Sequence, residues 1–146
     1  MRKIILILLL VFLYTNVINA QEWRTNFDEA KKIAKNENKH IILVFAGSDW
    51  CAPCIKLEKK ILATKEFKES VKNDFVLIKA DFPRKKKNQL AEGLQNQNKK
   101  LAEKYNKSGG FPLVVVVDKN GEKLGEVGYE NIPPNSYLDI LNQMIK

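Results

Sequence analysis

The only two cysteines of the chain, Cys51 and Cys54, stand in a C-x-x-C arrangement. An apolar run over residues 41–46 precedes them, and a helical pattern follows. Residues three positions apart lie on the same side of the first turn of a helix. Two sulfurs placed there can close a small disulfide ring with little movement of the backbone. These residues therefore predict reversible dithiol–disulfide chemistry.

The position of each cysteine predicts its role. Cys51 would lie where free backbone N–H groups and the positive end of the helix dipole favour a thiolate. We expect Cys51 to attack a substrate disulfide, and the more shielded Cys54 to resolve the mixed disulfide. Pro53 is compatible with this position, because the backbone N–H that proline lacks has no hydrogen-bond partner within the first turn of a helix.

Three other interpretations of the cysteine pair stay open. A zinc site needs about four ligands. The chain has 2 cysteines and 1 histidine, so we expect no metal and no other cofactor. A structural disulfide is compatible with an exported protein, although so short a loop constrains little of the unfolded chain. A fold that has lost its activity is the last alternative.

Two segments of the sequence carry a resemblance to a known family. Trp50-Cys51-Ala52-Pro53-Cys54 resembles the active-site motif of the thioredoxin superfamily. Gly110-Phe111-Pro112, followed by an apolar run over residues 113–117, resembles the second signature of that family, a cis-proline beside the thiols. The resemblance extends from about Phe27 to the C-terminus.

The resemblance implies a substrate-binding surface around the thiols. Trp50 would shield one side of them. Pro112 in the cis form would hold the backbone of Phe111 beside Cys51, where its peptide groups can bind an extended substrate segment. We therefore expect Trp50, Pro53, Phe111 and Pro112 to contact the substrate.

The sequence differs from thioredoxin at the carboxylate that would accept the proton of the resolving cysteine. Thioredoxins usually bury an aspartate in the strand before the motif, where this chain has Val44 or Phe45. Glu58 is the predicted substitute, because it follows Cys54 by four residues and shares its helix face. This spacing is similar to that in the C-terminal thioredoxin-like domain of membrane reductant transporters. A surface Glu58 paired with lysines is the alternative, and Asp49 is a second candidate proton acceptor.

The elements that position these residues follow from hydrophobic periodicity. We expect helices within residues 23–36, 52–63, 65–72, 90–105 and 136–145. We expect strands over residues 40–46, 75–81, 112–118 and 122–127. The first two strands are apolar at nearly every position, which predicts central strands covered on both faces. The fourth strand alternates and is predicted to lie at an edge.

The order of the elements predicts an α/β fold. Strands that alternate with helices predict a parallel core, and the turn at Asn120-Gly121 adds an antiparallel hairpin. We expect a three-layer sandwich with a central mixed sheet flanked by helices. The thioredoxin-like resemblance implies the same arrangement.

Residues 1–20 have the pattern of a cleavable signal peptide. Arg2 and Lys3 precede an apolar segment over residues 4–14, and Ala20 precedes the candidate cleavage site. An uncleaved anchor is the alternative, but this segment is shorter than the about 20 residues of a membrane span. No cysteine follows that could carry a lipid. We expect a single domain over residues 21–146 that is periplasmic or secreted, without stable membrane insertion after cleavage.

The chain is basic, with a formal net charge of +8 that falls to +6 without Arg2 and Lys3. A basic balance can indicate nucleic-acid binding, but export and the redox motif exclude nucleic acid as the expected partner. One basic loop, residues 84–87, holds Arg84, Lys85, Lys86 and Lys87. It is either solvated surface or a docking patch for an acidic partner.

The sequence thus predicts an exported thiol–disulfide oxidoreductase. A disulfide reductase is favoured, because the Ala-Pro dipeptide between the cysteines resembles that of reducing members of the family. Its expected partners are protein disulfide substrates and a membrane electron donor, and we expect a monomer. The alternatives are a disulfide-forming oxidase or isomerase, and a non-catalytic binding module that uses the groove near Phe111 and Pro112.

Overall fold

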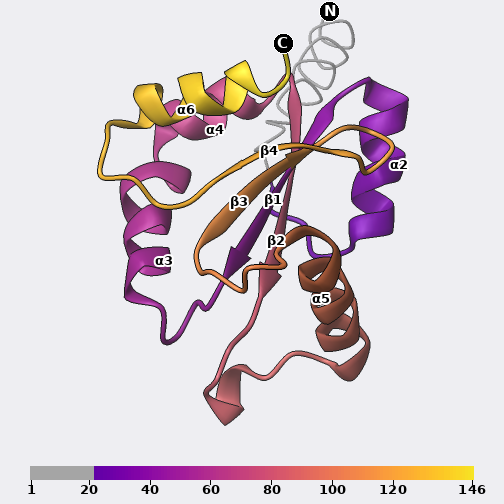
Figure 1. Cartoon of the computed structure of the whole chain (residues 1–146), viewed down its shortest axis with the longest axis vertical. Coiled ribbons are helices and arrows are strands. Elements are labelled where there is room, and N and C mark those ends of the chain that lie inside the picture. The colour runs from indigo at the N-terminus through magenta and orange to yellow at the C-terminus, as the bar shows by residue number, and fades with distance from the viewer. Residues whose placement is uncertain (1–21) are drawn as a thin grey trace, which may run out of the picture.

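The computed structural model describes residues 22–146, and the predicted signal peptide lies outside this range. Within it, four strands form one sheet in the order β2-β1-β3-β4. The strands are β1 (His40–Ala46), β2 (Phe75–Asp81), β3 (Leu113–Val117) and β4 (Lys123–Val127). The helices are α2 (Phe27–Glu37), α3 (Ala52–Leu57), α4 (Lys65–Val71), α5 (Glu92–Tyr105) and α6 (Pro134–Gln143) (Figure 1).

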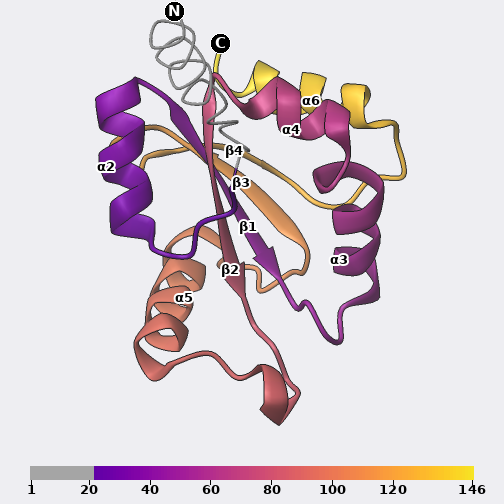
Figure 2. The ribbon, with the colours of Figure 1, turned by 180° about the vertical axis from the view of Figure 1, so that it is seen from behind.

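Helices cover both faces of the sheet (Figures 1 and 2). One apolar cluster lies between the sheet and α3, α4 and α6, and it includes Ile42 and Val44. A second cluster lies between the sheet and α2 and α5, and it includes Ile41, Leu43 and Phe45. Alternate residues of β1 therefore enter opposite cores, which explains its continuous apolar pattern. The predicted three-layer α/β sandwich is confirmed.

The sheet is mixed, as predicted, but only the β1–β2 pair of the predicted parallel core is parallel. Strand β1 pairs in parallel with β2 and antiparallel with β3, and β3 pairs antiparallel with β4. A parallel strand requires its crossover helix to return the chain to the other end of the sheet. Helix α5 instead stays at the end where β2 finishes (Figure 1), and the side-chain amide of Asn98 donates to the carbonyl of Asp81 at 3.0 Å. The chain re-enters the sheet from that end, so β3 runs opposite to β1.

The prediction that β2 is a central strand is also wrong, because β2 lies at one end of the four-strand order. A segment around Arg24 covers its outer edge. The N–H of Arg24 donates to the carbonyl of Leu77, and the N–H of Lys79 donates to the carbonyl of Arg24, both at 3.0 Å. Because the Arg24 segment covers this edge, β2 can be as apolar as a central strand although it lies at the end of the sheet.

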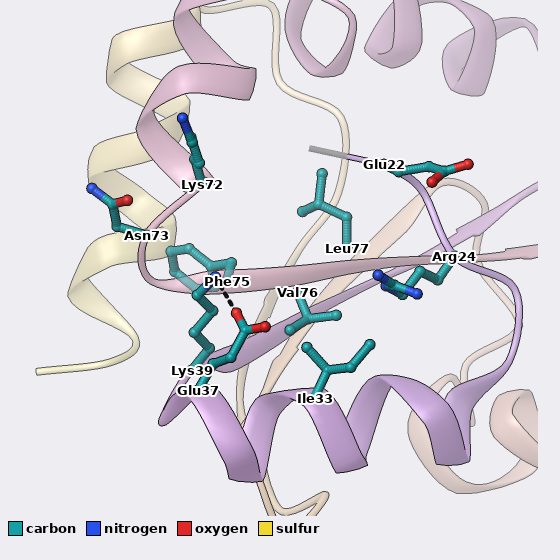
Figure 3. Close-up of a pocket in the computed structure, with 10 residues that line it drawn as sticks. All are labelled: Glu22, Arg24, Ile33, Glu37, Lys39, Lys72, Asn73, Phe75, Val76 and Leu77. Atoms are coloured by element: carbon teal, nitrogen blue, oxygen red, sulfur yellow. Dashed lines mark ion pairs between the residues drawn. The ribbon is translucent and has the colours of Figure 1, made fainter. Parts of the chain in front are cut away.

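A pocket of about 310 Å³ lies beside the beginning of β2. Figure 3 shows the ion pair between Lys39 and Glu37, 2.6 Å long, on its wall. The pocket lies at the amino end of β2, whereas the cysteines follow the carboxyl end of the parallel strand β1. It is therefore separate from the cysteines.

Two short helical segments complete the architecture. The π-helical segment η1 (Glu58–Leu62) continues α3, and the 3₁₀ turn η2 (Lys86–Asn88) lies in the loop after β2. Thr64 caps the beginning of α4, because its hydroxyl accepts a hydrogen bond from the N–H of Phe67 at 3.3 Å. The predicted hairpin between β3 and β4 is present, with Gly121 in the left-handed region at φ 89°. No helix among residues 22–146 is long and apolar enough to cross a membrane.

Candidate active site

Cys51 and Cys54 form a disulfide at the beginning of α3, with their Cα atoms 5.2 Å apart. Cys51 is the N-cap residue of α3, and its sulfur accepts a hydrogen bond from the N–H of Cys54 at 3.3 Å. The sulfur of Cys54 accepts one from the N–H of Gly47 at 3.5 Å. Backbone N–H groups directed at sulfur favour a thiolate over a thiol. The geometry is therefore suited to both steps of thiol–disulfide exchange.

The expected difference in shielding between the two cysteines is not seen in the disulfide form. Cys51 is 4% exposed and Cys54 is 5% exposed. What separates them is position, because Cys51 precedes the exposed residues Ala52 and Pro53, whereas Cys54 lies one turn into the helix. Pro53 lies in the first turn of α3, as predicted.

Three aromatic rings form a cluster beside the disulfide, here called the aromatic cluster: Trp50, Phe82 and Phe111. The ring centroid of Phe111 lies 5.7 Å from that of Trp50 and 5.3 Å from that of Phe82, both in edge-to-face arrangements. The indole N–H of Trp50 donates to the carbonyl of Phe82 at 2.7 Å. The cluster joins three loops that are far apart in the sequence.

The peptide bond between Phe111 and Pro112 is cis, as the resemblance implied. Trp50 and Phe111 pack against the apolar cluster that contains both cysteines. Pro112 is buried, and Phe111 is half-buried. The structure thus brings three of the four predicted substrate-binding residues together at one end of the sheet, while Pro53 lies on the exposed side of α3.

Glu58 is half-buried and forms an ion pair with a lysine, as the alternative interpretation expected, and the partner is Lys79 of β2. The ammonium of Lys79 donates to a carboxylate oxygen of Glu58 at 2.7 Å and lies 4.7 Å from the ring centroid of Trp23. Lys79 pairs in register with Val44, which faces the cluster containing Cys54. The ion pair therefore lies on the cysteine side of the sheet. A single lysine inside the apolar strand FVLIKAD was the available signal.

Asp49, the second candidate proton acceptor, is used to hold a loop. Its carboxylate accepts hydrogen bonds from the N–H of Arg84 at 2.9 Å, the N–H of Lys85 at 3.0 Å and the side-chain amide of Asn88 at 2.9 Å. These bonds, with that from Arg84 first, lower the pKa of Asp49. A carboxylate with three donors and a lowered pKa is a poor proton acceptor.

Arg84 is a site residue whose position the sequence did not predict. Its guanidinium carbon lies 3.7 Å from the ring centroid of Trp50. The basic loop was recognised from its composition, but composition does not show which aromatic ring a cation will cover. Across residues 22–146, no group of three or more histidine, cysteine or acidic side chains is arranged to hold a metal ion.

Comparison with known proteins connects this geometry to a family. A family model described as a thioredoxin-like domain matches residues 27–145. The chain is 34% identical over 125 residues to a Chlamydia pneumoniae protein named disulfide bond reductase DsbH, spanning 86% of this chain and 73% of that protein.

Two solved structures are similar over most of their length. One titled DsbH oxidoreductase has a TM-score of 0.79 at 33% identity, with 90% of each chain covered. The oxidised C-terminal domain of DsbD from Neisseria meningitidis has a TM-score of 0.55 at 19% identity, with 80% of this chain and 90% of that chain covered. At 19% identity, the DsbD domain shows a similar fold and nothing more.

Proposed function

Because the chain belongs to the thioredoxin-like domain family and is a thiol–disulfide oxidoreductase, we propose that it reduces disulfide bonds in exported proteins. The Cys51–Cys54 disulfide at the N-terminus of α3 carries this proposal. The reducing direction is supported by the relative named a disulfide bond reductase, at 34% identity. The Ala-Pro dipeptide between the cysteines supports the same direction.

The reaction begins with the reduced dithiol. The thiolate of Cys51 attacks one sulfur of a substrate disulfide, and the other substrate sulfur leaves as a thiolate that takes up a proton. Cys54 then loses its proton and attacks the sulfur of Cys51, which releases the second substrate sulfur. The substrate gains two electrons and two protons, and the protein ends as the Cys51–Cys54 disulfide.

Glu58 is the proposed acceptor of the Cys54 proton. It begins the segment directly after α3, and its backbone N–H donates to the carbonyl of Cys54, so the two residues lie one helical turn apart. Lys79 holds the carboxylate on the cysteine side of the sheet at 2.7 Å. No carboxylate of β1 competes for this role, because β1 reads HIILVFA.

The substrate is proposed to lie across an apolar surface around Cys51. Ala52 and Pro53 are exposed, and Ile55 is 38% exposed. The backbone of Phe111, at the cis peptide bond to Pro112, is proposed to line this surface. An extended substrate segment could bind there by main-chain hydrogen bonds, with its disulfide over Cys51.

The cellular setting belongs to the same proposal. Residues 1–20 act as a cleavable signal peptide, and residues 21–146 form one exported domain that acts as a monomer. A reductase outside the cytosol has no assured thiol pool to regenerate it. A membrane-embedded electron donor is therefore the proposed source of its electrons, and protein disulfides are the proposed substrates.

The reduction potential of the Cys51–Cys54 pair tests the direction. Equilibration with a graded dithiothreitol or glutathione series should give a value near about −270 mV, as in thioredoxin. A value near about −120 mV, that of a strong periplasmic oxidant, would reverse the direction. A Cys54→Ser variant should also accumulate covalent substrate complexes, whereas a Cys51→Ser variant should form none. Full disulfide reduction by Cys51→Ser would refute the catalytic role.

A further inference from the structure

The basic loop, residues 84–87, is an exposed group of cations next to the active site. Arg84, Lys85, Lys86 and Lys87 are all exposed. Within the described part of the chain, none of these four side chains forms an ion pair with a carboxylate. Solvated surface charges also lack such ion pairs, but the basic loop differs from them because it is held in place.

Hydrogen bonds fix the basic loop against the turn that leads into Cys51. Asp49, two residues before Cys51, accepts from the N–H groups of Arg84 and Lys85 and from the side chain of Asn88. The neighbouring Ser48 donates its N–H and hydroxyl to the carboxylate of Asp81, at 2.9 and 2.6 Å. The carboxylates of Asp49 and Asp81 thus already accept hydrogen bonds from backbone and uncharged side-chain donors. The side chains of Lys85, Lys86 and Lys87 stay exposed, and that of Arg84 packs on Trp50.

Arg84 has the most specific geometry of the four. Its guanidinium lies 3.7 Å over the indole of Trp50, and the indole is held by the carbonyl of Phe82. An arginine held over an aromatic ring loses less conformational freedom when it binds a ligand, and its N–H groups can still donate to that ligand. A guanidinium fits a carboxylate with two parallel hydrogen bonds. Because Trp50 directly precedes Cys51 and packs against the cluster that contains both cysteines, a carboxylate bound there would lie on the active-site face.

We propose that the basic loop is a substrate-docking surface, and that Arg84 selects disulfides flanked by aspartate or glutamate. The inference rests on the proposed function and names the substrate class of the same site. The occupant must present a disulfide to Cys51 and a carboxylate to Arg84. An acidic protein segment meets both requirements, whereas nucleic acid presents no disulfide.

The test compares peptides that differ only in charge. Each carries one cysteine joined as a mixed disulfide to 2-thiopyridine, flanked by Asp-Glu in one peptide and by Asn-Gln in the other. The Cys51 thiolate attacks the peptide sulfur and releases 2-thiopyridone, whose absorbance gives the second-order rate constant. Wild-type protein should react about tenfold faster with the acidic peptide at low salt. Half-molar salt should remove most of that difference.

Two variants distinguish a loss of selectivity for the acidic peptide from a general loss of activity. Arg84→Gln should slow the acidic peptide about fivefold and the amide peptide less than twofold. Lys32→Gln is the matched control, because Lys32 is exposed on α2 and its loss changes the net charge equally. It should change neither rate by more than twofold. Equal rates for both peptides with the wild type, or equal slowing of both by Arg84→Gln, would overturn the proposal.

Failure of the dithiol exchange on which the proposed function depends gives a different result. Wild-type protein would then react with neither peptide faster than a Cys51→Ser variant. In that case the docking surface is tested by binding alone, with the acidic peptide carrying serine in place of cysteine and NMR titration of the oxidised protein. Arg84→Gln should weaken that binding about fivefold. Equal binding by both proteins would refute the docking surface.

Discussion

Replacing Gly47 with alanine should destabilise the oxidised protein and displace Trp50. A Cβ added at Gly47 would lie 2.3 Å from the indole carbon Cε2 of Trp50 and 2.5 Å from its nitrogen. The indole must therefore move by about 1 Å to reach ordinary van der Waals contact. That movement strains the packing, breaks the hydrogen bond to the carbonyl of Phe82 and separates the ring from Arg84.

The expected loss follows from these three contacts. Overpacking costs about 1–3 kcal/mol, the hydrogen bond contributes about 1 kcal/mol, and the stacked arginine about 0.5–1 kcal/mol. The reduced freedom of the unfolded chain offsets about 0.4–1 kcal/mol. A net loss of about 2–4 kcal/mol should lower the melting temperature by roughly 10 °C for a chain of this size.

Thermal unfolding followed by circular dichroism, with tryptophan fluorescence as a second signal, measures this effect. Gly93→Ala is the matched control, because a Cβ there meets nothing within 4 Å. Gly93 lies in the exposed part of α5, so its replacement should stabilise the protein by about 0.5–1 kcal/mol. If Gly47→Ala melts within 1–2 °C of the wild type, roughly the error of such a scan, and leaves the tryptophan emission unchanged, the packing argument for Trp50 is refuted.

Three further predictions concern single groups. Glu58→Gln should slow the attack of Cys54 on the mixed disulfide about tenfold to hundredfold, without slowing the first attack by Cys51. Single-turnover release of the substrate thiols measures both steps. Equal rates for the second step in the variant and the wild type would remove Glu58 from the mechanism. Asp49 has a lowered pKa in the folded state, so its stabilisation is complete above about pH 4 and lost as the pH falls through the folded value. Urea midpoints between pH 2 and 6 should therefore fall less steeply for Asp49→Asn, and identical slopes would contradict this. Tyr137→Phe should lower the free energy of unfolding in urea by about 1 kcal/mol, because the buried hydroxyl of Tyr137 donates to the carbonyl of Gly128 at 2.9 Å. A stability equal to that of the wild type would show that this hydrogen bond contributes nothing.

Features set by neighbouring residues could be predicted from the chain alone. The bounds of β1 and β2 and the turn at Asn120-Gly121 appear where the sequence predicts them. Each is marked by residues that lie close together in the sequence. The C-x-x-C spacing belongs to the same class, because the first turn of one helix is enough to bring Cys51 and Cys54 within disulfide distance.

The direction of the strands needed the tertiary structure. Nothing in the α5 sequence shows that this helix stays at one end of the sheet, so an antiparallel β3 could not be read from the alternation of elements. The place of β2 at an edge was hidden for a related reason. The segment around Arg24 covers that edge, and edge and central strands then bury the same kinds of residues.

The electrostatic partners of the site also depend on the fold. Lys79 reaches Glu58 across 21 positions, and Asp49 reaches the N–H of Arg84 across 35. Residue type shows that such groups are charged, but only strand register and loop packing decide which charges meet. The dithiol chemistry could therefore be predicted from one short motif, whereas the surroundings that direct protons and substrates to it arise from segments brought together by the sheet.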